Sequence, residues 1–249
     1  MMKRVVLMVA LVMAVGVAHA DEPVAALPAT MPDGAKGASV KLGLNLFQKT
    51  KQYAPANVGN GLACRNCHLG SGTVKNAAPL SGLQGVFPEY SEREKRSITL
   101  QERIDGCFQR SMNGKALDPD SKEMAALIDF IAWIADPEKK AGRGIPELAG
   151  NLTGDPKRGK ALFADQCADC HGDDGQGMRE EGAYTYPPLW GPESFNDGAG
   201  MSHPRYAAGF IKWNMPYGDG GSLSDQDAAD IASFVISKPR PKYEKGKGK

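Results

Sequence analysis

The chain has 249 residues, of which 24% are charged, and its formal net charge at pH 7 is +1. This near-zero balance excludes the basic excess by which many proteins bind nucleic acids or anionic membrane surfaces. The length predicts two domains of about 100 residues each. Domains this small usually need something besides apolar burial to stabilise them.

The first 20 residues have the form of a cleaved export signal. A basic start precedes an apolar run over residues 5–17, and Ala-His-Ala at residues 18–20 is a small-x-small cleavage sequence. The run has 13 residues, fewer than the roughly 20 that span a bilayer. We therefore expect cleavage after Ala20 and a periplasmic mature chain without a membrane anchor.

The first structural unit is predicted over residues 37–136, after a loose Ala/Pro-rich lead-in at residues 21–36. It opens with a helix at residues 38–51 and closes with a helix at residues 121–136. In the closing helix, apolar residues recur at the helical spacing and form one wide stripe.

A further helix is predicted between these two, over residues 100–117. Thr99 followed three residues later by Glu102 is a capping box, which marks a helix start. Leu100 and Ile104 then begin an apolar face with helical spacing.

Three polar side chains on this helix, Arg103, Cys107 and Ser111, lie one turn apart on a single face. A cation, a thiol and a hydroxyl in a row are an unusual composition for a plain core face. The alternative for Cys107 is a small buried apolar residue or an intermolecular disulfide.

Two segments are expected outside the structural units. Residues 137–155 are rich in Pro, Gly and charge, and we interpret them as a linker because a similar pattern restarts after them. Residues 239–249 form a basic Pro/Lys/Gly tail that we expect to be solvated.

The second unit, residues 156–238, repeats the first. Gly-Lys-Ala-Leu-Phe at residues 159–163 corresponds to Gly-Leu-Asn-Leu-Phe at residues 43–47. A closing helix is predicted over residues 224–237, with a serine N-cap and acidic residues in its first turn.

Each unit contains one C-x-x-C-H sequence, at residues 64–68 and 167–171. This spacing is the attachment signature of c-type haem, in which two thiols bond to the cofactor and the histidine becomes the proximal iron ligand. The sequence thus predicts two covalently bound haem c groups. The attachment residues are Cys64, Cys67, Cys167 and Cys170, and the proximal ligands are His68 and His171.

Beside the proximal histidine, each haem iron has room for one further axial ligand. His203 is the one histidine of residues 21–249 that the motifs leave over, so two bis-histidine haems are impossible within the chain. We interpret His203 as a surface loop residue. In the second unit Met215 lies 44 residues after His171, which suits a methionine ligand.

In the first unit two residues compete for the iron. Met112 lies 44 residues after His68, the same offset, and predicts a plain electron carrier. Cys107 lies 39 residues after His68 and belongs to the row of polar side chains. Spacing favours Met112 and chemistry favours Cys107, so the residues alone leave the choice open.

The order of helix, haem motif, long loops, one methionine and final helix resembles the class I cytochrome c fold, in tandem. This resemblance implies a mainly α protein with two class I cytochrome c-like domains. The block Gly-Cys-Phe-Gln-Arg-Ser-Met-Asn-Gly-Lys at residues 106–115 is similar to the dihaem thiosulfate dehydrogenases, periplasmic cytochromes that join two thiosulfates into tetrathionate. The similarity runs from about residue 37 to residue 238.

This family resemblance assigns roles to individual residues. It implies that the iron ligands are His68 and Cys107 at the catalytic haem and His171 and Met215 at the electron-transfer haem. It also implies that Arg93, Arg103 and Ser111 surround the cysteine. Some relatives have an exchangeable lysine ligand where this chain has Asn214, so the chain departs from those relatives at this position, and Lys212 is the nearest lysine before it.

The implied reaction agrees with elementary electrostatics, because guanidinium groups offset the repulsion between two thiosulfate dianions. Arg96 and Arg110 are further candidates whose role the sequence leaves open. We expect a covalent Cys107–thiosulfate intermediate and an exported acceptor such as a small cytochrome c. The alternatives are a haem subunit of a multienzyme sulfur-oxidation complex and a non-catalytic dihaem electron carrier.

Overall fold

The computed structural model describes residues 27–245, apart from residues 29, 84, 136–143, 151 and 181. The expected signal peptide, residues 21–26 of the lead-in, residues 137–143 of the linker and residues 246–249 of the tail therefore lie outside the described residues. Within the described part of the chain, no helix is both long enough and apolar enough to cross a bilayer.

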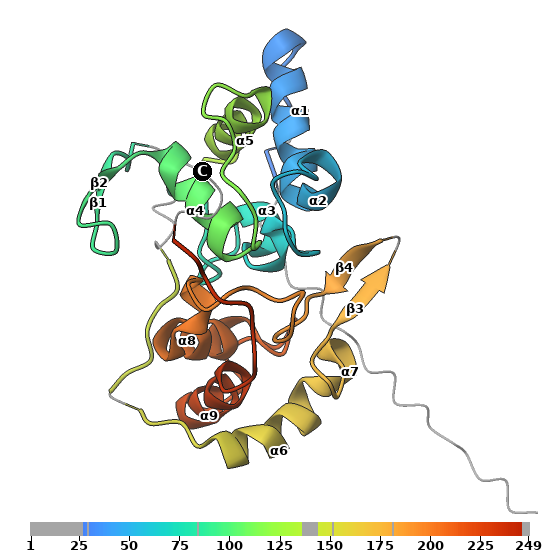
Figure 1. Cartoon of the computed structure of the whole chain (residues 1–249), viewed down its shortest axis with the longest axis vertical. Helices are drawn as coiled ribbons and strands as arrows, with labels where there is room; N and C mark the ends of the chain where they lie inside the picture. Colours follow the sequence, from blue (N-terminus) through green and yellow to red (C-terminus); the bar gives the residue numbers. More distant parts are fainter. Residues whose placement is uncertain are drawn as a thin grey trace, which may run out of the picture.

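The described chain is mainly helical and has two units, one above the other in Figure 1. The first contains α1 (Gly34–Gln48), α2 (Thr50–Tyr53), η1 (Cys64–Asn66), α3 (Leu69–Gly72), β1 (Glu89–Ser91), β2 (Arg96–Ile98), α4 (Leu100–Arg110) and α5 (Lys122–Trp133). The second contains α6 (Pro156–Gln166), α7 (Ala168–His171), β3 (Met178–Glu180), β4 (Ala183–Tyr186), η2 (Gly200–Ser202), α8 (Pro204–Asn214) and α9 (Asp225–Ile236). Each strand pair is an antiparallel hairpin.

The first unit is built on the pairing of α1 with α5. A Cβ atom at Gly43 would lie 2.0 Å from the carbonyl oxygen of Ala126, so the helices cross where a side chain is missing. Phe47 then packs on Phe130 with 5.2 Å between ring centroids. Backbone contact at a glycine lets the neighbouring aromatic rings interdigitate.

The second unit repeats this arrangement with α6 and α9. A Cβ atom at Gly159 would lie 2.0 Å from the carbonyl oxygen of Asp230, and Phe163 packs on Phe234 at 5.4 Å. The same glycine and phenylalanine therefore make the helix crossing in both units. This confirms the tandem, mainly helical architecture that the sequence predicts.

The helix that carries Cys107 begins as predicted and ends earlier. The Thr99 hydroxyl accepts a hydrogen bond from the Glu102 amide, and the Glu102 carboxylate accepts one from the Thr99 amide, so the capping box forms. The helix ends at Arg110 and not at residue 117, with Ser111 as C-cap. Asn113 has a φ of 49°, and this left-handed residue turns the chain out of the helix.

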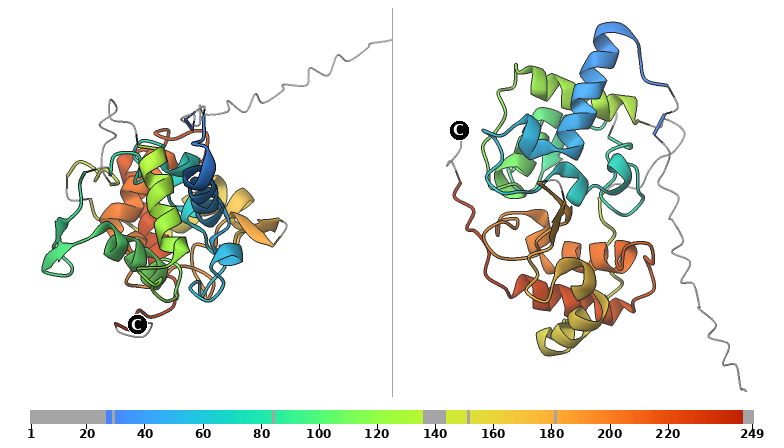
Figure 2. Two further views of the ribbon diagram at one scale, coloured as in Figure 1. Left: turned by 90° about the horizontal axis from the view of Figure 1, so that it is seen from above. Right: turned by 90° about the vertical axis from the view of Figure 1, so that its right-hand side faces the viewer.

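The two units pack against each other (Figure 2). They share part of one hydrophobic core. Tyr184, Phe195 and Ala199 of the second unit pack into the core cluster of the first. Polar contacts reinforce this interface: the Asn60 amide donates to the carbonyl oxygen of Ser194 at 3.2 Å, and the Asn113 amide donates to the same oxygen at 2.8 Å. The loop around residue 194 is thus fixed against the first unit.

Two segments differ from the sequence-based expectation. The first helix begins at Gly34, inside the expected lead-in. The tail is only partly solvated over residues 239–245: the Lys242 and Lys245 side chains are exposed, as expected, but its backbone is hydrogen-bonded to the second unit. The Gly191 amide donates to the Pro239 carbonyl at 2.8 Å, and the Asp197 amide donates to the Pro241 carbonyl at 3.0 Å.

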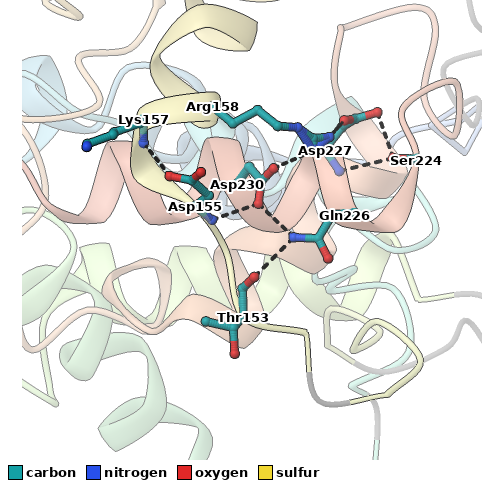
Figure 3. Close-up of polar contacts among 8 residues, drawn as sticks. All are labelled: Thr153, Asp155, Lys157, Arg158, Ser224, Gln226, Asp227 and Asp230. Carbon is teal, nitrogen blue, oxygen red and sulfur yellow. Dashed lines mark hydrogen bonds and ion pairs between the residues drawn. The ribbon is translucent and has the colours of Figure 1, made fainter.

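A buried carboxylate joins the first and last helices of the second unit (Figure 3). Asp230 is 1% exposed and accepts hydrogen bonds from the Arg158 guanidinium at 2.6 Å, the Asp155 amide at 2.8 Å and the Gln226 amide at 2.7 Å. Arg158 also pairs with Asp227. A buried carboxylate with three donors has its desolvation cost offset by hydrogen bonds.

We expect Asp230→Ala to lower the free energy of unfolding by about 3 kcal/mol, because it leaves these donors unpaired inside the unit. Denaturant unfolding of the haem-loaded protein, followed by circular dichroism, measures the change. Asp165 is exposed on the same helix as Arg158, so Asp165→Ala is the control. It should change the free energy of unfolding by less than about 0.5 kcal/mol. Equal effects of the two variants would show that the network contributes nothing specific.

Candidate active site

Helix α4 brings a cation to the unassigned cysteine. The Arg103 guanidinium donates a hydrogen bond to the Cys107 sulfur at 3.2 Å. Arg110 folds back over the same helix, where a Cβ atom at Gly106 would lie 2.1 Å from its Nη2. Two side chains of the row predicted from the spacing, Arg103 and Cys107, are therefore in direct contact. The missing side chain at Gly106 leaves room for a second guanidinium.

These side chains face a cavity of about 630 Å³. Five basic and three acidic side chains are among its lining residues, so its charge favours an anion. The predicted site residues of the first unit in its wall are Cys67, His68, Arg93, Arg103, Cys107 and Ser111. The second unit contributes Met201, Tyr206 and Phe210, and the tail contributes Tyr243 and Lys245.

The environment of Cys107 favours its thiolate. Burial opposes ionisation, but the charges of Arg103, His68 and Arg110 and a hydrogen bond with His68 lower the pKa of this thiol to about 6. The thiolate is the form of cysteine that binds metals and attacks electrophilic sulfur. Burial instead raises the pKa of the Cys64 thiol to about 11 and that of Cys67 to about 12.

Both C-x-x-C-H segments fit a covalently attached haem. The His68 Nδ1 donates to the carbonyl oxygen of Ala78 at 2.7 Å, and the His171 Nδ1 donates to that of Pro187 at 2.9 Å. Such tethers fix the ring and leave Nε2 for a metal. The paired thiols beside each ring, Cys64, Cys67, Cys167 and Cys170, are all free of disulfides.

Arg93 reaches the cavity from the turn between β1 and β2. Its Nη1 donates to the carbonyl oxygen of Gly198 at 2.5 Å, and its Nη2 lies 3.5 Å from Nε2 of His203. Burial, Arg110 and Arg103 lower the pKa of Arg93, as expected where like charges crowd together. The second unit thus supports an arginine of the first.

The two arginines that the sequence left open have different surroundings. Arg110 is 13% exposed, and its guanidinium lies 3.6 Å from Glu94 and close enough to influence both Cys107 and Arg93. Arg96 is 56% exposed and pairs with Glu102 at 2.6 Å. Arg110 is therefore the better placed of the two to act on a bound anion.

The two candidate ligands of the first iron, Met112 and Cys107, have different surroundings. Met112 is 3% exposed and belongs to the core cluster with Phe108 and Leu46. It is absent from the cavity wall, where Cys107 lies with His68. This placement favours Cys107 as the sulfur that faces the first haem motif.

In the second unit, Met215 follows α8 directly as its C-cap. The Lys212 amine donates to the carbonyl oxygens of Gly221 at 3.1 Å and Leu223 at 2.5 Å, so it is engaged elsewhere. Asn214 is buried and donates to the carbonyl oxygen of Asn76 at 3.2 Å. These contacts favour Met215 over Lys212 as a ligand.

Sequence reasoning missed three parts of the site. His203 is exposed, as expected of a surface residue, but it caps α8 and contacts Arg93. The sequence signal for that helix was Pro204, because proline is favoured at the first helical position. Tyr206 and Tyr243 had no local signal, since they reach the cavity only through packing between units.

The chain resembles proteins of known activity over nearly its full length. Residues 48–138 match the family described as SoxA/TsdA, cytochrome c domain, and residues 156–238 match the family described as cytochrome c. Thiosulfate dehydrogenase from Allochromatium vinosum is 45% identical over 95% of this chain and 93% of its own length. Thiosulfate dehydrogenase from Psychrobacter arcticus is 46% identical over 85% of this chain and 66% of its own length.

A solved structure shows the same fold. The thiosulfate dehydrogenase TsdBA from Marichromatium purpuratum, in its as-isolated form, superposes with a TM-score of 0.83 at 36% identity over 87% of this chain. This chain spans about half, 49%, of the length of that one. Since relatives above 40% identity align over most of the chain and both matching families are cytochrome c domains, this protein belongs to the thiosulfate dehydrogenase family and carries two covalent haem c groups.

Proposed function

We propose that this protein oxidises two thiosulfate ions to one tetrathionate and passes two electrons to an external acceptor. The observation that carries this proposal is the contact between Arg103 and Cys107 in a cavity with a basic excess. A thiolate beside guanidinium groups is suited to binding an anionic sulfur compound and reacting with it.

The haem groups would be held by the residues that the motifs identify. Cys64 and Cys67 attach the first haem, with His68 and Cys107 as iron ligands. The second haem is attached by Cys167 and Cys170, with His171 and Met215 as iron ligands. When bound, the two haems supply one-electron acceptance, so that together they take the two electrons of one turnover.

The arginines stabilise two dianions bound in one cavity. At about 4 Å, two unit charges near a protein surface repel by about 4 kcal/mol, and each thiosulfate carries two. Arg93 and Arg103 both line this cavity, and Ser111 adds a hydroxyl. The guanidinium groups offset the repulsion and orient the sulfonate oxygens by charge-assisted hydrogen bonds.

Cys107 is the proposed nucleophile. In the first step, the thiolate and the sulfane sulfur of one thiosulfate form an S–S bond while two electrons leave, which gives a cysteine S-thiosulfonate. In the second step, another thiosulfate attacks that sulfane sulfur, the S–S bond to Cys107 breaks, and tetrathionate and the thiolate are released. The second step is an ordinary exchange at a disulfide.

A non-catalytic electron carrier is the less favoured alternative. It predicts Met112 on the first iron, but this side chain lies in the hydrophobic core and not in the cavity wall. A haem subunit of a sulfur-oxidation complex would also use Cys107, and it would transfer thiosulfate to a carrier protein. Only the enzyme makes free tetrathionate without a partner.

The decisive experiment supplies the purified haem-loaded protein with thiosulfate and an artificial one-electron acceptor. We expect one tetrathionate for every two electrons accepted. If both haems are intact and reducible by dithionite but no tetrathionate forms, the partner-dependent subunit or the carrier replaces the enzyme.

The cellular context is part of this proposal. The export signal in residues 1–20 supports cleavage after Ala20 and a periplasmic enzyme, and the acceptor would be an exported protein such as a small cytochrome c. The working domain bounds are residues 37–136 and 156–238, joined by residues 137–155. N-terminal sequencing of the protein from a periplasmic extract tests the cleavage site.

Met215→Ala should change the spectrum of the second haem and lower its reduction potential by on the order of 0.1 V, because a thioether ligand favours the reduced iron. Spectroelectrochemical titration of the haem-loaded protein measures both. Met178 is exposed on β3, and Met178→Ala is the control that should leave the potential unchanged. An unchanged second haem in Met215→Ala would remove this residue from the ligand set.

A further inference from the structure

The C-terminal segment, residues 239–245, leaves α9 and runs back toward the first unit. Figure 1 and Figure 2 show it running up one side of the second unit and ending near α4. Its final described residues, Tyr243 and Lys245, are part of the cavity wall that contains Cys107. This segment follows the second unit in the sequence, but its end lies at the candidate active site.

The segment is held by specific contacts along its length. The Arg240 guanidinium lies over the Phe195 ring at 4.4 Å and donates to the carbonyl oxygen of Val235 at 2.8 Å. The Tyr243 amide donates to the Asp197 carboxylate at 2.7 Å. The Asp197 amide donates in return to the Pro241 carbonyl at 3.0 Å. Asp197 is therefore bonded to the segment through both its backbone and its side chain.

The loop that carries Asp197 also supports the catalytic side of the cavity. The Asn196 amide donates to the carbonyl oxygen of Arg110 at 3.1 Å, at the end of α4. The Gly198 carbonyl accepts the hydrogen bond of Arg93 at 2.5 Å. Tyr243 packs on this glycine so closely that a Cβ atom there would lie 2.7 Å from its Cβ and Cγ.

We propose that residues 239–245 are a positioning element of the thiosulfate site, which holds the loop at residues 196–198 against α4 and thereby fixes the guanidinium of Arg93. This inference rests on the proposed function. Arg93 has five N–H donors, and anchoring one of them on Gly198 leaves others for the anion. Tyr243 closes the wall beside that guanidinium, so the segment acts on substrate binding and not on the reacting sulfur.

A matched pair of variants at Asp197 tests the anchor without touching the cavity wall. Asp197→Ala removes the acceptor of the Tyr243 amide, whereas Asp197→Asn keeps an oxygen in its place. We expect Asp197→Ala to raise KM for thiosulfate about tenfold, with kcat changed less than about twofold, because a displaced positioning group weakens binding. Asp197→Asn should stay within about twofold of the wild type for both constants.

Sulfate and hydrogen exchange give readouts beyond turnover. Sulfate is a dianion that does not react, so its inhibition constant should rise in Asp197→Ala by the same factor as KM. Hydrogen-exchange mass spectrometry of the haem-loaded protein should show faster exchange over residues 194–199 in Asp197→Ala alone. Tyr243→Ala should also raise KM, and Tyr53→Ala, which removes an exposed ring far along the chain on α2, is its control.

The outcomes separate this inference from the proposed function. If the wild type forms no tetrathionate, the proposed function fails, while hydrogen exchange still reports whether the segment holds the loop. If the wild type is active but Asp197→Ala leaves KM and the sulfate inhibition constant unchanged, the inference is wrong. It is also wrong if Asp197→Ala loses haem or lowers kcat as much as it raises KM, because the role would then be purely structural.

Discussion

Cys107→Ala should abolish tetrathionate formation, with kcat lowered by about 10³-fold or more, as when the nucleophile of a catalytic unit is removed. The side chain faces the cavity, receives a hydrogen bond from Arg103 and has a lowered thiol pKa. No other described cysteine can replace it, because the other four belong to the haem motifs. The assay is tetrathionate yield from thiosulfate with an artificial one-electron acceptor.

Met112→Leu is the matched control for this variant. The exchange conserves side-chain volume in the core and should cost less than about 1.5 kcal/mol of stability. If Cys107 is the ligand and nucleophile, Met112→Leu keeps both the activity and the spectrum of the first haem. If Met112→Leu changes that spectrum while Cys107→Ala does not, the first iron is ligated by the methionine and the carrier reading is correct.

The covalent step can be tested without turnover. Intact-mass measurement after exposure of the oxidised protein to thiosulfate should detect a species heavier by one thiosulfate. That species should be absent from Cys107→Ala and present in Met112→Leu. Full tetrathionate production by Cys107→Ala would show that the two thiosulfates couple without a bond to the protein.

Arg103→Ala is expected to lower kcat/KM for thiosulfate by about 10²–10³-fold. Arg103 donates to the sulfur of Cys107, and the two groups each favour the charged form of the other, so the pKa of Arg103 is raised. Its loss removes both a stabiliser of the thiolate and a cation for the substrate. Steady-state kinetics over a range of thiosulfate concentrations should show that saturating substrate does not restore kcat.

Two further variants make this result specific. Arg103→Lys keeps the charge but not the forked geometry, and it should recover only part of the activity. Arg96→Ala removes an exposed arginine already paired with Glu102, and it should change kcat/KM by less than about threefold. Comparable losses in Arg96→Ala and Arg103→Ala would mean that overall positive charge, and not the contact with Cys107, governs the reaction.

Local patterns in the sequence were sufficient for α1, α5, α9, the start of α4 and the haem motifs. The capping box at Thr99 and Glu102 marks a real helix start, and the repeated glycine and phenylalanine mark the helix crossing in each unit. These features depend on residues within a few turns of one another. Helix α8 was not predicted, although Pro204 in its first turn and its apolar face are typical of a helix.

The repeated C-x-x-C-H motifs in the sequence determined two units with one covalent haem c each, and the resemblance to class I cytochromes c implied their fold. The row of Arg103, Cys107 and Ser111 follows from spacing along one segment. Residue spacing and side-chain chemistry left Cys107 and Met112 as equal candidates, and only the tertiary structure puts Cys107 in the cavity wall and Met112 in the core. It likewise decided that the C-terminal segment reaches the active site. Such contacts join segments that are separated in the chain, as Arg93 and Gly198 are by 105 residues, and no local pattern encodes them.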